Sequence, residues 1–198
     1  MRLVVIDHLT LDGVMQAPGR TDEDTRGGFT HGGWSQPYGD EVMGAVMGER
    51  MAHSGGGMLF GRRTYEDLLR YWNTQPDSPF TQALNNTPKY VASMTLKAPL
   101  PWPNSTLLGG DLANEVAMLK KKRPKGGGDV AIMGSGTLVQ PLMRLGQIDE
   151  YMLMIHPLVL GSGRRLFTDD GAFATLQLVD AKPTTKGVII ATYQPTEP

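Results

Sequence analysis

The chain has 198 residues, a length that fits one domain. It contains no cysteine, which excludes disulfides, thiolate metal sites and a cysteine nucleophile. Its 19 basic and 20 acidic residues give a formal net charge of −1, which argues against a nucleic-acid-binding protein, because such a protein normally carries a basic surplus on one face.

The N-terminal segment is typical of a first strand. Leu3 to Ile6 is a short apolar run, and the N-terminal segment continues with Asp7 and His8 and lacks the small-residue cleavage site of a signal peptide. No uninterrupted apolar stretch in the chain reaches the roughly 20 residues that cross a membrane. We therefore expect a cytoplasmic protein that partners neither a membrane nor a nucleic acid.

Predicted strands and helices alternate over most of the chain. Strands are short apolar runs rich in β-branched residues, and helices are segments in which apolar residues recur at helical spacing. The predicted strands are 3–6, 58–60, 89–93, 105–108, 130–133, 151–156 and 188–192, and the predicted helices are 40–53, 64–71, 112–122 and 137–145. The long segment 9–39 is rich in Gly, Asp, Thr and Pro, and a loop of this length is often functional, for example as a lid.

The order of these elements indicates an α/β sandwich. Strands that alternate with helices favour a mostly parallel sheet, whereas the last two strands have no crossover helix between them and predict antiparallel additions at the C-terminal end. We expect residues 1–198 to form a single domain.

Two glycine turns each follow the carboxyl end of a predicted strand. They are Gly61-Arg62-Arg63-Thr64 and Gly134-Ser135-Gly136-Thr137. In open α/β sheets, ligands collect at this edge, where helix N-termini bind phosphates through backbone N–H groups. Glycine would let the backbone approach a phosphate closely, and the arginines could bind it. Alternatively, the glycines only permit tight turns and the arginines stay in solvent.

Several motifs in their chain order resemble the dihydrofolate reductase superfamily. They are Thr10-Leu11-Asp12-Gly13, the two glycine turns, and Asp149-Glu150 followed by the segment 157–167, which reads PLVLGSGRRLF. The sequence is most similar to the branch related to the C-terminal reductase domain of the riboflavin-pathway deaminase–reductase, over nearly the whole chain. This resemblance implies a dihydrofolate-reductase-like three-layer sandwich and an NAD(P)H-dependent reductase.

The resemblance also implies a place for the cofactor. NADPH would lie across the strand ends, with its phosphates at Gly61 to Thr64 and at Gly134 to Thr137. Ser93 matches a family position that approaches the adenosine 2′-phosphate. Many relatives have an arginine at the next position, where this chain has Met94, so NADH is not excluded. Arg62 or Arg63 could compensate for that missing charge.

The candidate catalytic residues are two aspartates. Asp12 lies in an Asp-Gly turn, and Asp40 corresponds loosely to the acidic residue that contacts the pterin in dihydrofolate reductases. Each has a structural alternative, a turn residue for Asp12 and a helix N-cap for Asp40. Trp34 and Tyr38 could stack on a flat heterocyclic substrate, or they could fix the long loop to the core. The four histidines show no metal-ligand spacing, so we expect no metal site.

We therefore expect an NAD(P)H-dependent reductase that transfers hydride to a small heterocyclic substrate. The nearer relatives suggest 5-amino-6-(5-phosphoribosylamino)uracil, from riboflavin biosynthesis, and the wider superfamily suggests dihydrofolate. The alternative is a non-catalytic nucleotide-binding or interaction protein that retains the fold. A homodimer is expected, because relatives often pair and the β-rich end offers a sheet edge that needs covering.

Overall fold

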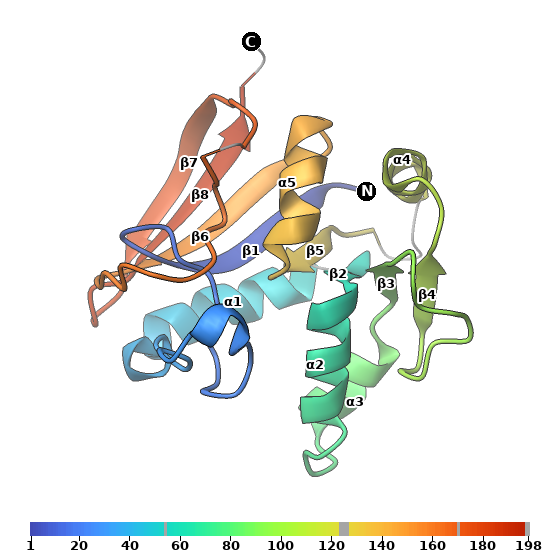
Figure 1. Cartoon of the computed structure of the whole chain (residues 1–198), viewed down its shortest axis with the longest axis horizontal. Helices are drawn as coiled ribbons and strands as arrows, with labels where there is room; N and C mark the ends of the chain where they lie inside the picture. The colour runs from blue at the N-terminus through green and yellow to red at the C-terminus, as the bar shows by residue number, and fades with distance from the viewer. Residues whose placement is uncertain (54, 123–126, 170, 197–198) are drawn as a thin grey trace.

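The structure, a computed structural model, describes residues 1–53, 55–122, 127–169 and 171–196. Within these residues, one eight-stranded sheet lies between two layers of helices (Figure 1). The strands are β1 Leu3–Thr10, β2 Gly57–Gly61, β3 Lys89–Ala92, β4 Ser105–Leu108, β5 Val130–Met133, β6 Glu150–His156, β7 Leu176–Pro183 and β8 Ile189–Pro195. The α-helices are α1 Glu41–His53, α2 Arg62–Trp72, α3 Pro79–Asn86, α4 Leu112–Lys121 and α5 Gly136–Arg144. None of these described helices is long and apolar enough to cross a bilayer.

The strand order across the sheet is β4-β3-β2-β5-β1-β6-β8-β7. The strands from β4 to β6 are all parallel, and β8 and β7 continue the sheet in antiparallel pairing. This confirms the predicted α/β fold, with a mostly parallel sheet and antiparallel strands at the C-terminal end.

Two elements are absent from the predicted set, namely β7 and α3. Every residue of β7 after Leu176 is exposed, so the strand lacks the apolar alternation that marks a half-buried strand. Helix α3 has only eight residues and buries two of them, Thr81 and Leu84. A window this short does not show a helical period clearly.

The side chains of β1 alternate between two cores. Leu3, Val5 and Leu9 belong to the larger core, to which α4 and α5 contribute, whereas Val4 and Ile6 pack with α1 on the opposite face. This double burial is typical of a central parallel strand that is covered by helices on both faces. In Figure 1, α4 and α5 lie on one side of the sheet and α1, α2 and α3 on the other.

Strand β1 is longer than the predicted strand 3–6. Its ladder with β5 ends at the pair Ile6–Met133, whereas its ladder with β6 continues to the pair Thr10–His156. The chain of β5 turns away immediately after Met133. The next residue of β1, Asp7, therefore lies where its neighbouring strand has ended.

The segment between β1 and α1 is packed against the C-terminal part of the chain. It contains two short 3₁₀ helices, Arg26–Gly28 and Gln36–Tyr38. Val14 forms a β-bridge with Arg165. A small core joins the two parts and consists of Val14, Ala17, Phe29 and Trp34 with Leu158 and Leu160. Much of the predicted long loop is thus anchored rather than free in solvent.

Candidate active site at the carboxyl ends of the parallel strands

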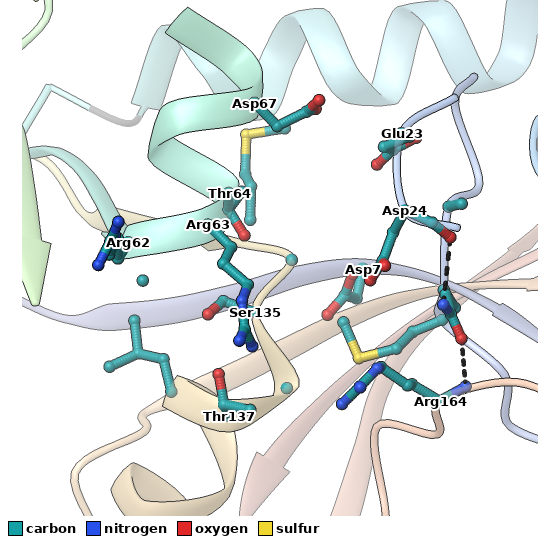
Figure 2. Close-up of a pocket in the computed structure, with 18 of the residues that line it drawn as sticks. Asp7, Glu23, Asp24, Arg62, Arg63, Thr64, Asp67, Ser135, Thr137 and Arg164 are labelled. Atoms are coloured by element: carbon teal, nitrogen blue, oxygen red, sulfur yellow. Dashed lines mark hydrogen bonds between the residues drawn. The ribbon is translucent and has the colours of Figure 1, made fainter. Parts of the chain in front are cut away.

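A cavity of about 1620 Å³ lies at the carboxyl ends of the central parallel strands. Both glycine turns line it, together with the strand ends at Ala92 and Met133 and residues 15–20 and 22–26 of the segment after β1. Figure 2 shows the starts of α2 and α5 on one side of this cavity and the segment that carries Glu23 and Asp24 on the other. The volume exceeds the roughly 300–1,000 Å³ of ordinary small-ligand pockets, so a long ligand fits.

The two glycine turns touch each other. A Cβ atom placed on Gly61 would lie 2.2 Å from Oγ of Ser135, and one placed on Gly134 would lie 3.5 Å from the side chain of Thr64. Gly134 and Ser135 both have positive φ, of 63° and 66°, which turns the chain sharply from β5 into α5. Two segments more than 60 residues apart in the sequence therefore form one continuous wall.

The two helices that begin at this wall lack side-chain caps. No side chain in the part of the chain that the structure describes caps α2 after Gly61 or α5 after Ser135. The other three described α-helices are capped, because Asp40 accepts from the backbone N–H of Met43 and because Ser78 and Asp111 cap α3 and α4. The unpaired N–H groups in the first turns of α2 and α5 suit an anion, which the helix dipole also favours.

Arginines add positive charge to the same wall. Figure 2 shows the side chain of Arg63 extending from the start of α2 toward Ser135 and Thr137. Its guanidinium forms no ion pair with any described residue, so it remains available for a ligand. Arg62 donates to Oε1 of Glu66 at 2.9 Å and to Oγ1 of Thr95 at 2.7 Å.

Ser93 lies beside the side chain that Arg62 binds. The Ser93 Oγ accepts from the backbone N–H groups of Thr95 at 3.2 Å and Leu96 at 3.0 Å, which orders the turn after β3. Backbone N–H groups, hydroxyls, arginines and glycines without a Cβ are the donor set that a nucleotide with several phosphates requires. The residues present therefore fit such a group.

The opposite side of the cavity carries several carboxyl groups. Glu23 accepts from the backbone N–H groups of Gly19 at 2.7 Å and Arg20 at 3.0 Å. Asp24 pairs with Arg26, whose Nε lies 2.7 Å from Oδ1. Asp7 faces the same space (Figure 2). The cavity thus has one side rich in backbone donors and an opposite side, which we call the acidic pole, where the carboxyl groups of Asp7, Glu23 and Asp24 gather together with arginines such as Arg20 and Arg26.

Asp7 is the functional candidate that sequence reasoning missed. It is only 4% exposed, and its Oδ2 atom has no hydrogen-bond partner among the described residues. Burial raises the pKa of Asp7 well above its ordinary value, and the negative charge of Glu23 raises it further. One signal was present in the sequence: Asp7 is in phase with Leu3, Val5 and Leu9, so it is an acidic residue at an apolar position of the strand.

The structure brings all the predicted cofactor-binding residues to this cavity. The lining residues include Gly61, Arg62, Arg63, Thr64, Ser93, Gly134, Ser135, Gly136 and Thr137. Met94 lines it too and is 80% exposed. Cofactor binding by these residues stays a prediction.

The predicted catalytic and substrate-binding residues do not line the cavity. Asp12 accepts from Oγ1 of Thr10 at 2.5 Å and from the N–H of Gly161 at 2.8 Å. Asp40 caps α1 and also accepts from the backbone and the hydroxyl of Thr185, both at 2.7 Å. Hydrogen bonds from Met43 and Thr185 lower the pKa of Asp40 to about 2, which makes this carboxyl a poor proton donor.

The two aromatic candidates are part of the packing between the long segment and the sheet. Trp34 is 7% exposed and donates from Nε1 to the backbone oxygen of Gln16 at 2.7 Å. The ring of Tyr38 packs edge-on against His156, with 5.3 Å between ring centres. These contacts match the alternative in which both side chains fix the segment to the core.

Comparison with known proteins identifies the family. The sequence pattern of the RibD C-terminal domain matches residues 4–190. The chain belongs to the RibD C-terminal domain family. Its curated relatives include the uncharacterized protein YyaP of Bacillus subtilis (strain 168), which is 30% identical over 141 residues, 69% of this chain and 72% of that protein.

Solved structures with this fold agree with that membership. A putative riboflavin biosynthesis protein from Shewanella sp. PV-4 has a TM-score of 0.69 at 21% identity, with all of both chains covered. A pyrimidine reductase-like protein from Corynebacterium diphtheriae has 0.60 at 14%, covering 100% of this chain and 92% of that one. Dihydrofolate reductase from Enterococcus faecalis, complexed with NADP(H), has 0.61 at 14%, covering 99% and 97%. The fold of this RibD C-terminal domain protein is therefore dihydrofolate-reductase-like, as the resemblance implies.

Proposed function

We propose that this chain is an NADPH-dependent reductase that transfers hydride to a small heterocyclic substrate. The observation that carries the proposal is the single wall formed by two glycine turns, two helix starts without a described side-chain cap, and Arg63, which forms no ion pair with a described residue. Family membership supports the choice of reaction, since similar folds include a pyrimidine reductase-like protein and a dihydrofolate reductase complexed with NADP(H).

Each part of the wall has a role in holding the cofactor. The first-turn N–H groups of α2 and α5, with Arg63, would bind the diphosphate. Arg62 would bind the adenosine 2′-phosphate with Ser93 and Thr95, and would supply the charge that Met94 cannot. When bound, NADPH supplies the hydride, and the protein supplies orientation and a pocket shielded from water.

The acidic pole would bind the substrate. A ring that carries amino groups or ring nitrogens matches the carboxyl groups of Asp7 and Glu23, because these groups provide both acceptors and a donor. Aminopyrimidines and reduced pterins share this chemistry. They are therefore the substrate classes to test, with 5-amino-6-(5-phosphoribosylamino)uracil and dihydrofolate as the representatives.

NADPH binding, measured by isothermal titration calorimetry, tests the proposal. Arg63→Ala is expected to raise the Kd roughly ten-fold to a hundred-fold, because a hydrogen bond to a charged group contributes about 1.5–3 kcal/mol. Lys121→Ala is the control, since it removes an exposed cation at the end of α4, away from the cavity. Absence of NADPH binding at millimolar concentration contradicts the proposal. Binding without NADPH oxidation by either substrate class would favour a non-catalytic nucleotide-binding protein.

A further inference from the structure

The position of Asp7 follows from the unequal lengths of β1 and β5. The last paired residues are Ile6 and Met133, so Asp7 stands level with Gly134, the first residue of the second glycine turn. The side chain of Asp7 lies on the same face of the sheet as those of Leu3 and Val5. Leu3 and Val5 pack against α4 and α5, whereas Asp7 lines the cavity. Figure 2 shows Asp7 between Ser135 and the segment that carries Asp24.

The carboxyl group of Asp7 is held on one side only. Backbone N–H groups of His8 and Gly134 interact with it, whereas Oδ2 is left without a partner among the described residues. No described arginine or lysine forms an ion pair with it. A buried polar atom without a partner costs stability, and a catalytic role is one reason why a protein keeps such an atom.

The charges around Asp7 favour its neutral form. Glu23, from the segment after β1, is the charged group that acts on it, and it raises the pKa of Asp7 in addition to the effect of burial. Burial also raises the pKa of Glu23. Asp24, Arg63 and Arg164 line the same cavity, but Asp24 is engaged by Arg26. A neutral carboxyl donates one hydrogen bond, which an ionised one cannot do.

We propose that, given the reductase function proposed above, Asp7 is the proton donor of the cavity and protonates the substrate atom next to the carbon that accepts hydride. As the substrate C=N or C=O bond receives hydride at carbon, its π electrons move to nitrogen or oxygen. The O–H bond of Asp7 breaks, an N–H or O–H bond forms on the substrate, and Asp7 becomes a carboxylate. After the product leaves, solvent water that enters the cavity returns a proton to the Asp7 carboxylate.

The other titratable groups near this site are less suited to the role. Burial lowers the pKa of His8 to about 3, with a further effect of His156, and burial lowers the pKa of His156 to about 4. Both rings are therefore neutral at pH 7 and have no acidic proton to give. Asp12 and Asp40 lie outside the cavity lining.

The experiment compares the wild-type protein with Asp7→Asn, which keeps the size of the side chain and removes the acid. Infrared spectroscopy of the free protein at pH 7 is expected to show a carbonyl band of a neutral carboxylic acid that disappears in the variant. The Kd for NADPH is expected to stay within about two-fold, while kcat for the substrate class that is reduced falls roughly 10²-fold to 10⁴-fold. The alkaline limb of the wild-type pH profile, where Asp7 loses its proton, should disappear as well.

A second variant, Glu23→Gln, gives an independent measurement. Removing the negative charge is expected to lower the pKa of Asp7, so the alkaline limb of the pH profile should move to lower pH. A glutamine oxygen can still accept from Gly19 and Arg20, so the loop keeps its hydrogen bonds. Urea unfolding of both variants checks that each is folded.

The outcomes separate this inference from the function on which it rests. Two results would contradict the donor role of Asp7 and leave the reductase function intact. One is an ionised Asp7 at pH 7, and the other is an Asp7→Asn protein with wild-type kcat and an unchanged alkaline limb of the pH profile. A wild-type protein that neither binds nor oxidises NADPH would overturn the reductase function, and the donor role with it, even if the infrared band were present.

Discussion

Gly61 lies so close to Ser135 that only a hydrogen atom fits between its Cα and the serine hydroxyl: a Cβ atom there would approach Oγ to 2.2 Å. This contact joins the end of β2 to the start of α5. It also sets the spacing of the two helix starts that form the proposed phosphate site. A side chain at position 61 therefore fits only if the Ser135 hydroxyl rotates away and its Cβ, at 3.3 Å, also shifts.

Gly61→Ala is expected to separate the two turns. The added methyl group must displace Ser135, so the Kd for NADPH should rise by at least ten-fold and the melting temperature should fall. Gly44→Ala is the matched control, because a Cβ at this position in α1 meets no atom within 4 Å. That change should stabilise the protein by roughly 0.5–1 kcal/mol, the ordinary gain from alanine in a helix. Equal NADPH affinity in both variants would place the phosphate site elsewhere.

Arg62→Ala tests the choice between the two nicotinamide cofactors. The side chain of Arg62 reaches from the start of α2 to the turn after β3, where it donates to Thr95 beside Ser93. Removing a cation from a phosphate should weaken NADPH binding by roughly ten-fold. NADH lacks the 2′-phosphate, so its Kd should change by no more than about two-fold. Fluorescence titration of both cofactors gives the comparison, and an equal loss for both would remove Arg62 from 2′-phosphate recognition.

Asp40 provides a test of its two suggested roles. Asp40→Ala removes the N-cap of α1 and the hydrogen bonds to Thr185, so it should lower the free energy of unfolding and the melting temperature. Asp40→Asn keeps a capping oxygen and should lose less. If capping is the role of Asp40, the asparagine variant will retain wild-type kcat in NADPH oxidation assays. A large fall in kcat for that folded variant would instead support the catalytic assignment.

The histidine pair predicts a loss of stability in acid. His8 Nδ1 and His156 Nε2 lie 2.8 Å apart, and burial lowers the pKa of both rings, to about 3 and about 4. Because these values lie below the ordinary histidine pKa of about 6.5, the folded state binds fewer protons than the unfolded state. The stabilisation is complete above about pH 6.5 and is lost as the pH falls toward 4, by an amount on the order of a few kcal/mol.

Urea unfolding at pH 7 and pH 4.5 measures this loss. In His156→Gln the difference between the two pH values should be smaller, since one titrating ring is gone and the amide can still pair with His8. A variant with the same pH dependence as the wild type would show that other groups cause the acid sensitivity. Asp7 acts in the opposite direction, because its raised pKa means that its contribution is lost as the pH rises.

The parallel part of the sheet could be predicted because each of its strands is a local apolar run. The apolar run Val130–Met133 is followed directly by glycines, so the end of the strand is visible in the sequence. The second turn was therefore predicted at the correct strand end. Burial in parallel sheets covers both faces, which makes such runs easy to recognise. Strand β7 could not be recognised in this way, since it is exposed and is held by its pairing with β8.

The role of Asp7 in the acidic pole could not be predicted from the sequence for a different reason. A charged residue ordinarily ends an apolar strand, so Asp7 suggested a boundary after Ile6. Its burial comes from partners that are distant in the sequence, namely the turn at Gly134 and the segment that carries Glu23. Residue type can also mislead in the other direction, because side chains that are suited to chemistry can have structural contacts. Asp12 holds a turn, Asp40 caps a helix, and Trp34 and Tyr38 pack the long segment against the core.

The absence of side-chain caps on α2 and α5 also bears on the stability of the protein. Three helices complete their hydrogen bonds with Asp40, Ser78 and Asp111, which the chain carries permanently. Among the described residues, no side chain does the same for α2 or α5. An anion bound between them would complete two helices at once, so the ligand would act as a structural part of the protein as well as a reactant.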